Sequence, residues 1–361
     1  MLKSLQKISP LFPALFLLLN LSCSSTPKTE KSKDAISILS FNVENLFDTQ
    51  HDEGKQDYPF LPLSSKKGNL AVEAACEKQD SEYRQEECLE NDWTEDKLKL
   101  KMKRLADAVL SAPGGAPDIL ILQEVENLSI LKRWNQEYLQ AAGYQTEILI
   151  EGDDPRGIDV AVLSRLPLAG KPQLQRLTFT VDPTDKNWKK PLSRGILDVP
   201  LKLPDGQTLT VLGFHFPSQS NPLQQRVDAV NSLNLWAKSK PAVSLIVAGG
   251  DSNISAKEEA VNQLQAKTLS SQWKVSNLIG CKDCKGTEVH QGVWSFFDLL
   301  LFSPNLMDGK ASYQVDPSSI QVSTEGKYQV EMNGEPARFN PKSSVGVSDH
   351  LPIYAELVPR K

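Results

Sequence analysis

The chain has 361 residues, of which 40% are hydrophobic and 24% are charged, and this composition excludes disordered and fibrous proteins. Its 40 Lys and Arg residues against 45 Asp and Glu residues give a net charge of −5. Overall charge therefore does not favour non-specific binding to polyanions, although a local basic cleft or a bound cation remains compatible with it. A chain of this length buries one large hydrophobic core or two ordinary ones.

Residues 1–22 have the features of an export signal. Two lysines precede an apolar run over residues 11–19, which is too short to span a membrane. Cys23 follows, and the segment resembles a bacterial lipoprotein signal in which this cysteine carries lipid. We expect a membrane-anchored lipoprotein of the periplasm or cell surface. The alternative is an ordinary cleaved signal peptide, which leaves a secreted protein.

Residues 23–35 are rich in Ser, Lys and Thr and are expected to tether the anchor to a domain over residues 36–361. We expect this domain to be monomeric.

Export affects the interpretation of the other cysteines, which are Cys76, Cys88, Cys281 and Cys284. In a cytosolic chain they would suggest zinc, whereas in an oxidising compartment two disulfides are expected. Four cysteines allow three pairings. The simplest joins Cys76 to Cys88 and Cys281 to Cys284.

Apolar runs and helical patterns alternate along the chain, which predicts an α/β fold. Strands are expected at residues 36–41, 119–122, 144–150, 160–164, 195–203, 208–216, 243–248 and 294–302, with a last strand beginning at residue 350. Helices are expected at residues 94–109, 128–142 and 221–238. Residues 49–91 are polar and acidic and predict an insertion closed by a disulfide, and residues 304–344 predict only short strands.

Side chains with oxygen or imidazole donors lie near the ends of these strands. They are Asn42, Glu124, His215, Asp251, Asn253 and the adjacent pair Asp349 and His350. Each is common in turns on its own, but together they predict one site at a common rim of the fold. The oxygens of Glu124, Asn42 and Asp349 are hard ligands that suit Mg²⁺ or Mn²⁺ and bind zinc poorly.

The remaining side chains suit hydrolysis of a phosphoric ester. His350 would take a proton from water, held by Asp298 from the middle of the strand expected at residues 294–302. The side chains that would orient the nucleophile or bind the phosphoryl oxygens are Asp251, Asn253, His215 and Arg156.

Seven segments, taken in order, resemble the endonuclease/exonuclease/phosphatase family, whose members include pancreatic deoxyribonuclease, apurinic endonucleases, inositol polyphosphate 5-phosphatases and neutral sphingomyelinases. The segments are residues 41–48, 122–125, 156–163, 214–218, 250–253, 297–300 and 348–352. The resemblance implies a four-layered α/β sandwich, with two mixed β-sheets packed face to face and helices outside.

The resemblance also implies roles for the site residues. Glu124, with Asn42 and Asp349 near it, would bind Mg²⁺, and His350 paired with Asp298 would activate water. The side chains that would serve the phosphate and the leaving group are Asp251, Asn253 and His215.

We therefore expect an exported Mg²⁺-dependent phosphodiesterase that acts on nucleic acid. Alternatives with the same fold are a sphingomyelinase-type enzyme and an inositol-phosphate phosphatase, and an alternative of another class is an inactive lipoprotein that binds a partner. The sequence shows no apolar stretch suited to membrane insertion, which counts against the sphingomyelinase-type enzyme. It shows no dense Lys/Arg cluster near the motifs, which counts against the inositol-phosphate phosphatase. The complete set of site residues counts against the third.

Overall fold

The computed structural model describes residues 31–79, 81–182, 184 and 189–360. The predicted export signal, Cys23 and most of the predicted tether lie outside these residues. Residues 31–35 contact the folded body, since the backbone N–H of Ser32 donates to Oε2 of Glu356 at 3.2 Å. Within the described ranges, no helix is long and apolar enough to cross a membrane.

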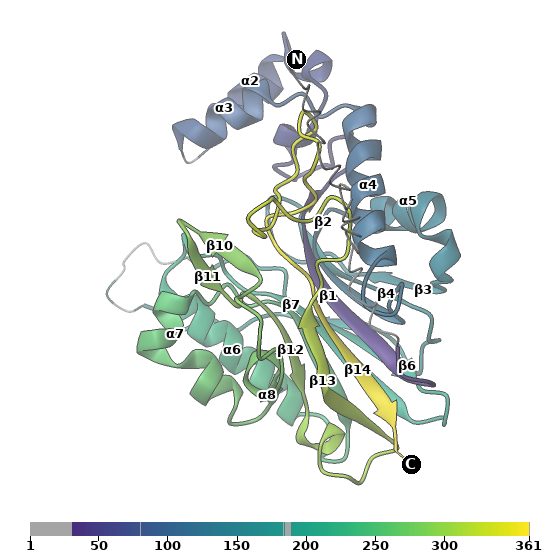
Figure 1. The fold of residues 1–361 in the computed structure, drawn as a ribbon. Coiled ribbons are helices and arrows are strands. Elements are labelled where there is room, and N and C mark those ends of the chain that lie inside the picture. The colour runs from purple at the N-terminus through teal and green to yellow at the C-terminus, as the bar shows by residue number, and fades with distance from the viewer. Residues whose placement is uncertain (1–30, 80, 183, 185–188, 361) are drawn as a thin grey trace, which may run out of the picture.

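Two six-stranded sheets form the centre of the molecule (Figure 1). The first sheet has the order β13 (Tyr313–Val322), β14 (Ile353–Pro359), β1 (Ile36–Leu46), β2 (Ile119–Val125), β4 (Asp159–Ser164) and β3 (Thr146–Leu149). The second has the order β5 (Gln173–Gln175), β6 (Ile196–Lys202), β7 (Thr208–His215), β8 (Leu245–Asp251), β12 (Asp298–Phe302) and β9 (Lys274–Val275). The pairs β1–β2 and β7–β8 are parallel and the other described neighbours are antiparallel, so both sheets are mixed.

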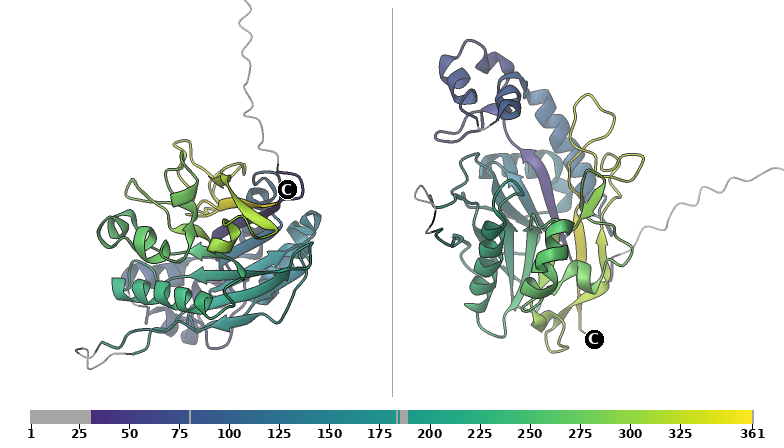
Figure 2. Two further views of the ribbon diagram at one scale, coloured as in Figure 1. Left: turned by 90° about the horizontal axis from the view of Figure 1, so that it is seen from below. Right: turned by 90° about the vertical axis from the view of Figure 1, so that its left-hand side faces the viewer.

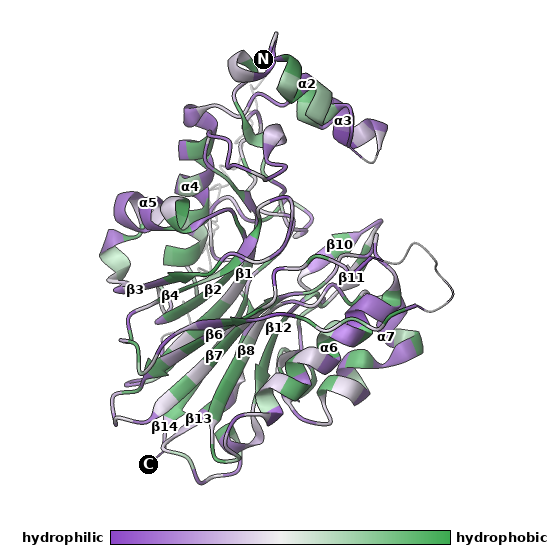
Figure 3. Cartoon of the chain, turned by 180° about the vertical axis from the view of Figure 1, so that it is seen from behind, coloured by the Kyte–Doolittle hydropathy of each residue, from purple (hydrophilic) through white to green (hydrophobic). Residues whose placement is uncertain are grey.

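The sheets pack face to face through apolar side chains such as Ile121 and Val162 from the first sheet and Val247 from the second, and all three are fully buried. Figure 3 shows the strands largely in the hydrophobic colour. Two glycines allow this close approach. A Cβ on Gly249 would lie 2.6 Å from Cδ1 of Ile121, and a Cβ on Gly213 would lie 2.5 Å from a methyl carbon of the opposite sheet.

Helices cover the outer faces of the sheets (Figure 2). The helices α4 (Glu95–Leu110) and α5 (Leu128–Tyr138) cover the first sheet, and α6 (Leu223–Lys238) covers the second. Along the chain, α6 is followed by α7 (Ala256–Asn262), a π-helical turn (Leu264–Leu269) and α8 (Ser276–Ile279). The side chain of Thr94 caps α4 by accepting from the N–H of Lys97, as its sequence position predicts. The four-layered α/β sandwich predicted from the sequence is confirmed.

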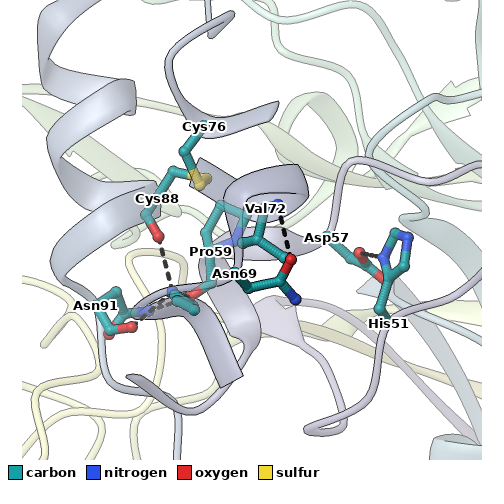
Figure 4. The surroundings of a disulfide bond; sticks show 9 residues. His51, Asp57, Pro59, Asn69, Val72, Cys76, Cys88 and Asn91 are labelled. Carbon is teal, nitrogen blue, oxygen red and sulfur yellow. Dashed lines mark hydrogen bonds and ion pairs between the residues drawn. A yellow bond between two sulfur atoms is a disulfide. The ribbon is translucent and has the colours of Figure 1, made fainter. Parts of the chain in front are cut away.

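The insertion, residues 49–91, folds into a 3₁₀ turn (Tyr58–Phe60) and three short helices, α1 (Leu63–Lys66), α2 (Leu70–Cys76) and α3 (Glu82–Glu90). The disulfide Cys76–Cys88 joins α2 to α3 (Figure 4). Lys66 lies buried beneath them, and its ammonium donates to the carbonyl oxygens of Pro59, Cys88 and Asn91 at 3.0, 2.8 and 2.7 Å. The insertion therefore has its own small interior, and the predicted disulfide is confirmed.

The second predicted disulfide, Cys281–Cys284, is also confirmed. Other boundaries differ from the prediction. The strand predicted at residues 243–248 continues through Gly249 and Gly250 to Asp251 as β8. Gly250 allows the close approach of the neighbouring strand, because a Cβ there would lie 1.9 Å from the carbonyl oxygen of Phe214. The last strand begins at Ile353 and not at residue 350.

The strand predicted at residues 294–302 is interrupted. A hairpin of β10 (Glu288–His290) and β11 (Val293–Ser295) comes first, and β12 begins at Asp298. Asp298 is therefore the first residue of a strand, whereas the sequence predicted a position in mid-strand. The region expected to contain only short strands includes the ten-residue β13.

Candidate active site

The predicted site residues meet where β1, β2, β7 and β8 end and β12 begins. Asn42 on β1 links the two sheets, because its Nδ2 lies 3.5 Å from Oε1 of Glu124 on β2 and donates to Oδ2 of Asp251 on β8 at 3.1 Å. We call the set Asn42, Glu124, His215, Asp251, Asn253, Asp298 and His350 the candidate cluster. The common rim predicted from the sequence is present.

Irregular backbone directs Glu124 into this cluster. Glu124 has a φ of 65°, and the pairing of β2 shifts register around it. On the neighbouring strand, Glu44 and Asn45 also have positive φ values, of 50° and 62°, and the pairing shifts between Asn42 and Leu46. The bulged backbone brings the N–H of Asn45 to Oε2 of Glu124 at 3.1 Å. Bulges and unfavourable φ values of this kind often re-aim side chains at functional sites.

Asp251 lies at the centre of the cluster and is hydrogen-bonded by Asn253. The backbone N–H and Nδ2 of Asn253 donate to Asp251 at 2.7 and 3.0 Å, and Nδ2 also donates to the carbonyl oxygen of Phe216 at 3.2 Å. Burial raises the pKa of Asp251 to about 7, although the charge of His350 opposes this shift. Asp251 is thus able to change protonation state near neutral pH.

His215 is buried beside Asp251, with Nε2 at 3.4 Å from Oδ2. Burial lowers its pKa well below 6.5, and the nearby charges of Arg194, Arg156 and His350 lower it further. His215 is therefore neutral at pH 7. Its Nδ1 has no hydrogen-bond partner in the part of the chain that the structure describes.

His350 forms the predicted pair with Asp298, with Nδ1 at 2.7 Å from Oδ2. Its Nε2 lies 3.9 Å from Asp251 and 4.0 Å from Asp349. Burial lowers the pKa of His350, but the three carboxylates of Asp298, Asp251 and Asp349 outweigh burial and raise it well above 6.5. In this arrangement the three carboxylates favour the protonated form of His350.

Two arginines near the cluster share one carboxylate, that of Asp154. Nε of Arg156 lies 3.5 Å from Oδ1 of Asp154, and Nε of Arg194 lies 2.9 Å from Oδ2 of the same carboxylate. The second contact is an ion pair without hydrogen-bond geometry, because Nε of Arg194 has no acceptor in line with its N–H. Arg194 is almost fully buried, whereas the side chain of Arg156 is 39% exposed.

The sequence prediction included Arg156 but missed Arg194. A signal was present, because Arg194 is followed by Gly195 immediately before a strand, as Arg156 is followed by Gly157 shortly before another. Both guanidinium groups lower the pKa of His215, so both lie within electrostatic reach of the predicted phosphate site.

Asp349 reaches the rim through a network of charges that the sequence did not predict. Arg338 donates to Oε1 of Glu44 at 2.6 Å and lies 3.0 Å from Oδ2 of Asp349. Lys101 is fully buried, lies 3.9 Å from Glu44 and donates to the carbonyl oxygen of Val347 at 2.6 Å. Burial lowers the pKa of Lys101 to about 8. These contacts hold the segment that carries Asp349 and His350 against β1.

The cluster can be compared with known proteins. Residues 69–359 match the model of the endonuclease/exonuclease/phosphatase family. The chain belongs to this family. No protein with a curated function matched the sequence.

Solved structures of the same fold cover 90% of this chain. A family protein of Leptotrichia buccalis C-1013-b is 15% identical over 100% of its own chain, with a TM-score of 0.52. The mannosyl-6-phosphatase Bt3783 of Bacteroides thetaiotaomicron is 18% identical over 99% of its chain, with a TM-score of 0.50. A humanized D. rerio TDP2 is 16% identical over 99% of its chain, with a TM-score of 0.50. At these identities the likeness shows the fold.

Enzymes of this family commonly use divalent metal ions. The described residues contain no group of three or more His, Cys, Asp or Glu side chains arranged to hold a metal. Mg²⁺ is usually held by one or two carboxylates together with water and substrate oxygens, so a full cage is not required. Glu124, with its side chain 17% exposed, fits this mode. Asn42 turns its Nδ2 toward Glu124, and its Oδ1, the atom that could bind a metal, accepts from the N–H of Glu44 at 3.0 Å. Asp349 is a further carboxylate on the rim, paired with Arg338.

Proposed function

We propose that this member of the family is an exported Mg²⁺-dependent phosphodiesterase, with nucleic acid as the substrate that the sequence predicts. Family members are phosphodiesterases or phosphatases. The observation that carries the proposal is the buried line of Asp298, His350 and Asp251, in which Nε2 of His350 faces Asp251 at 3.9 Å. An imidazole held by one carboxylate and directed at a second polar group is suited to exchanging a proton with water or substrate.

In the proposed reaction a water molecule attacks phosphorus, the bond from phosphorus to the leaving oxygen breaks, and the leaving oxygen takes a proton from solvent water to become the alcohol. The neutral form of His350 accepts the water proton at Nε2, while Nδ1 is held by Asp298. Asp251, with a pKa of about 7, and Asn253 orient the reacting groups. When bound at Glu124, Mg²⁺ would supply positive charge to the phosphate and offset the carboxylates that raise the pKa of His350.

The phosphoryl oxygens would be bound by Arg156, Arg194 and the neutral imidazole of His215. A buried guanidinium is desolvated, so its charge acts strongly on a nearby phosphate. His215 has an unpartnered Nδ1, and its Nε2 lies on the side of Asp251. The buried side chains of Arg194 and His215 are already held in place before substrate binds, which favours stabilisation of charge in the transition state.

Two disulfides support the exported location, because disulfides persist in oxidising compartments and are rare in the cytosol. The lipid on Cys23 and the export signal remain part of the proposal.

The test is an assay of the full-length protein in non-ionic detergent on plasmid DNA, RNA, sphingomyelin, inositol phosphates, bis-p-nitrophenyl phosphate and p-nitrophenyl phosphate. Hydrolysis of diesters should require Mg²⁺ or Mn²⁺ and stop with a chelator. Glu124→Gln should raise the Mg²⁺ concentration needed for half-maximal activity, because it weakens a hard ligand without changing side-chain size. Hydrolysis of monoesters alone would assign a phosphatase, and no hydrolysis of any ester would assign a binding protein.

A further inference from the structure

A group of carboxylates lies just beyond the ends of β1 and β2, where the insertion begins. Its members are Asp48, Asp52, Asp57 and Glu126, and we call them the loop cluster. We propose that the loop cluster binds a calcium ion, separate from the metal expected at Glu124. The inference goes beyond the proposed function and does not depend on it.

Hydrogen bonds and charge show that these carboxylates lie close to one another. The backbone N–H of Asp48 donates to Oε2 of Glu126 at 2.7 Å, and the N–H of Asp52 donates to Oδ2 of Asp57 at 2.6 Å. Burial raises the pKa of Glu126 to about 9, and the charges of the three aspartates raise it further. All three aspartates are therefore within electrostatic reach of Glu126.

The carboxylate of Glu126 supplies a second, independent indication of a ligand. This residue is 3% exposed. Its Oε2 accepts from Asp48, but its buried Oε1 has no hydrogen-bond partner among the described residues. A buried carboxylate oxygen without a partner is costly, and three further carboxylates nearby increase the cost. A cation bound between these groups would remove both penalties.

The protein itself does not supply that cation. Over the described ranges, no Lys or Arg side chain forms an ion pair or hydrogen bond with a carboxylate of the loop cluster. The guanidinium of Arg133 is paired with Glu95 and Glu137. The imidazole of His51 contacts Asp57 through Nδ1, a pair that Figure 4 shows beside the insertion.

The donor atoms favour calcium. Oδ2 of Asp48 and Oδ1 of Asp52 accept no hydrogen bond from a described group, because the donors Gln50 and Asn127 engage the other oxygen of each carboxylate. Carboxylate oxygens of this kind bind Ca²⁺ and Mg²⁺ and bind zinc poorly.

The geometry of the loop separates Ca²⁺ from Mg²⁺. The described side chains do not form a closed cage for a metal. Mg²⁺ requires nearly octahedral ligands, whereas Ca²⁺ accepts about six to eight oxygens in flexible geometry, among them backbone carbonyls and water. A loop whose side chains provide only part of the ligands therefore suits Ca²⁺ better.

The loop cluster is joined to the candidate cluster along the chain and across the fold. Glu126 comes shortly after Glu124, just past the end of β2. Between Asp52 and Asp57, the N–H of Gln56 donates at 2.7 Å to the carbonyl oxygen of Pro155, the residue before Arg156. A bound Ca²⁺ would therefore fix the loop that supports the Arg156 turn.

The experiment measures Ca²⁺ binding by the full-length protein in non-ionic detergent. The protein is first freed of metal with a chelator, and Mg²⁺ is then kept constant in all samples. Calorimetric titration should find one Ca²⁺ per molecule with a Kd on the order of 10⁻⁴ M, as in extracellular calcium modules. A hundredfold excess of Ca²⁺ over this Kd should raise the Tm by about 4 °C.

Three variants test the ligands. Glu126→Gln should abolish the rise in Tm. Without Ca²⁺ this variant should unfold at the wild-type Tm or above it, because a buried unpartnered charge is gone, and this separates lost binding from misfolding. Asp52→Asn, at a less buried position, should weaken Ca²⁺ binding by about tenfold or more. Glu53→Gln, exposed in the same loop, is the matched control and should bind Ca²⁺ as the wild type does.

A fourth variant, Glu124→Gln, separates the loop cluster from the metal site of the proposed reaction and should keep the rise in Tm. Loss of the rise in Glu124→Gln would place the ion at the candidate cluster and overturn the inference. No Ca²⁺ binding by the wild type, or equal binding by Glu126→Gln, would also overturn it. Binding that depends on Glu126 and not on Glu124 supports the inference even when no ester is hydrolysed, so failure of the proposed function is recognised separately.

Discussion

The pKa values of single residues in the candidate cluster depend on their neighbours. His215 and His350 are both buried, yet their pKa values shift in opposite directions. Burial and two arginines lower the pKa of His215, whereas the carboxylates around His350, led by Asp298, outweigh burial and raise it. The same side chain thus has two roles in one site, a neutral hydrogen-bonding group and a group that exchanges a proton.

The role of His350 leads to the first prediction. His350→Ala should lower kcat on a phosphodiester by a factor on the order of 10²–10⁴, the usual size of proton-transfer catalysis, with little change in Mg²⁺ affinity. Asp298→Asn should cause a smaller loss, because the imidazole stays but loses its orientation. Steady-state kinetics over a series of Mg²⁺ concentrations measures both. A wild-type rate for His350→Ala would show that another group carries the proton.

Asp159, at the start of β4, leads to a prediction about stability. Burial raises its pKa from 3.8 to about 7, its Oδ1 accepts from the N–H of Gly152 at 2.7 Å, and its buried Oδ2 has no partner among the described residues. The pKa of Asp159 is higher in the folded state than in the unfolded state. This carboxyl therefore contributes in full to the free energy of unfolding below pH 3.8. The contribution is lost as the pH rises through 7.

Asp159→Asn keeps the acceptor for Gly152 and removes the charge. Between pH 4 and pH 8, the free energy of unfolding of the wild type should fall relative to that of the variant by roughly 2–4 kcal/mol. Urea unfolding at the two pH values measures the difference. A parallel pH dependence of the two proteins would mean that Asp159 stays ionised in the folded state.

At the scale of elements, α4 positions the segment that carries His350. Arg104 on this helix donates to four carbonyl oxygens, those of Asn340, Ser343, Val345 and Gly346. Lys101, one turn earlier, holds the carbonyl oxygen of Val347. The segment between β13 and His350 has little regular structure, so its shape depends on these two side chains.

Arg104→Met tests this dependence. The substitution leaves four carbonyl oxygens without their donor, so the protein should lose on the order of 2–4 kcal/mol of stability. kcat should also fall, because Asp349 and His350 lose their support. Lys103→Met, an exposed site on the same helix, is the control and should change stability by less than about 0.5 kcal/mol. Urea unfolding measures the stability of both variants, and kinetics on one phosphodiester measure their kcat values. Equal stability and kcat in both variants would contradict the positioning role of Arg104.

At the scale of the whole molecule, the sandwich and the insertion have separate interiors. Val72, Cys76 and Cys88 form a small buried cluster apart from the three large ones that involve the sheets. Phe60 joins the two parts by stacking on Phe47 with ring centroids 4.0 Å apart. So small a cluster contributes little burial, and the insertion therefore depends on its disulfide.

The prediction for the whole molecule concerns its thiols. Non-reducing peptide mapping of the exported protein should find Cys76 linked to Cys88 and Cys281 linked to Cys284. No thiol should react with an alkylating reagent, because the sulfur of Cys23 should carry lipid. Bound zinc, or four reactive thiols in the native protein, would show that the chain is not exposed to an oxidising compartment.

The sequence by itself determined the order of the layers and most of the cluster. Strands such as β2 and β7 are local apolar runs, so their positions follow from neighbouring residues alone. Asn42, Glu124 and His215 were found because polar side chains at strand ends are also a local signal. The disulfide Cys76–Cys88 was found from cysteine spacing within one segment.

Only the tertiary structure decided which distant groups meet. Arg338 and Glu44 are 294 residues apart, and no periodic pattern links them. The close packing of the sheets, and not a turn, explains Gly249, because a side chain there would collide with Ile121 of the opposite sheet. The raised pKa of His350 depends on carboxylates brought together from separate elements. Burial and electrostatic fields depend on spatial neighbours, which local sequence patterns do not contain.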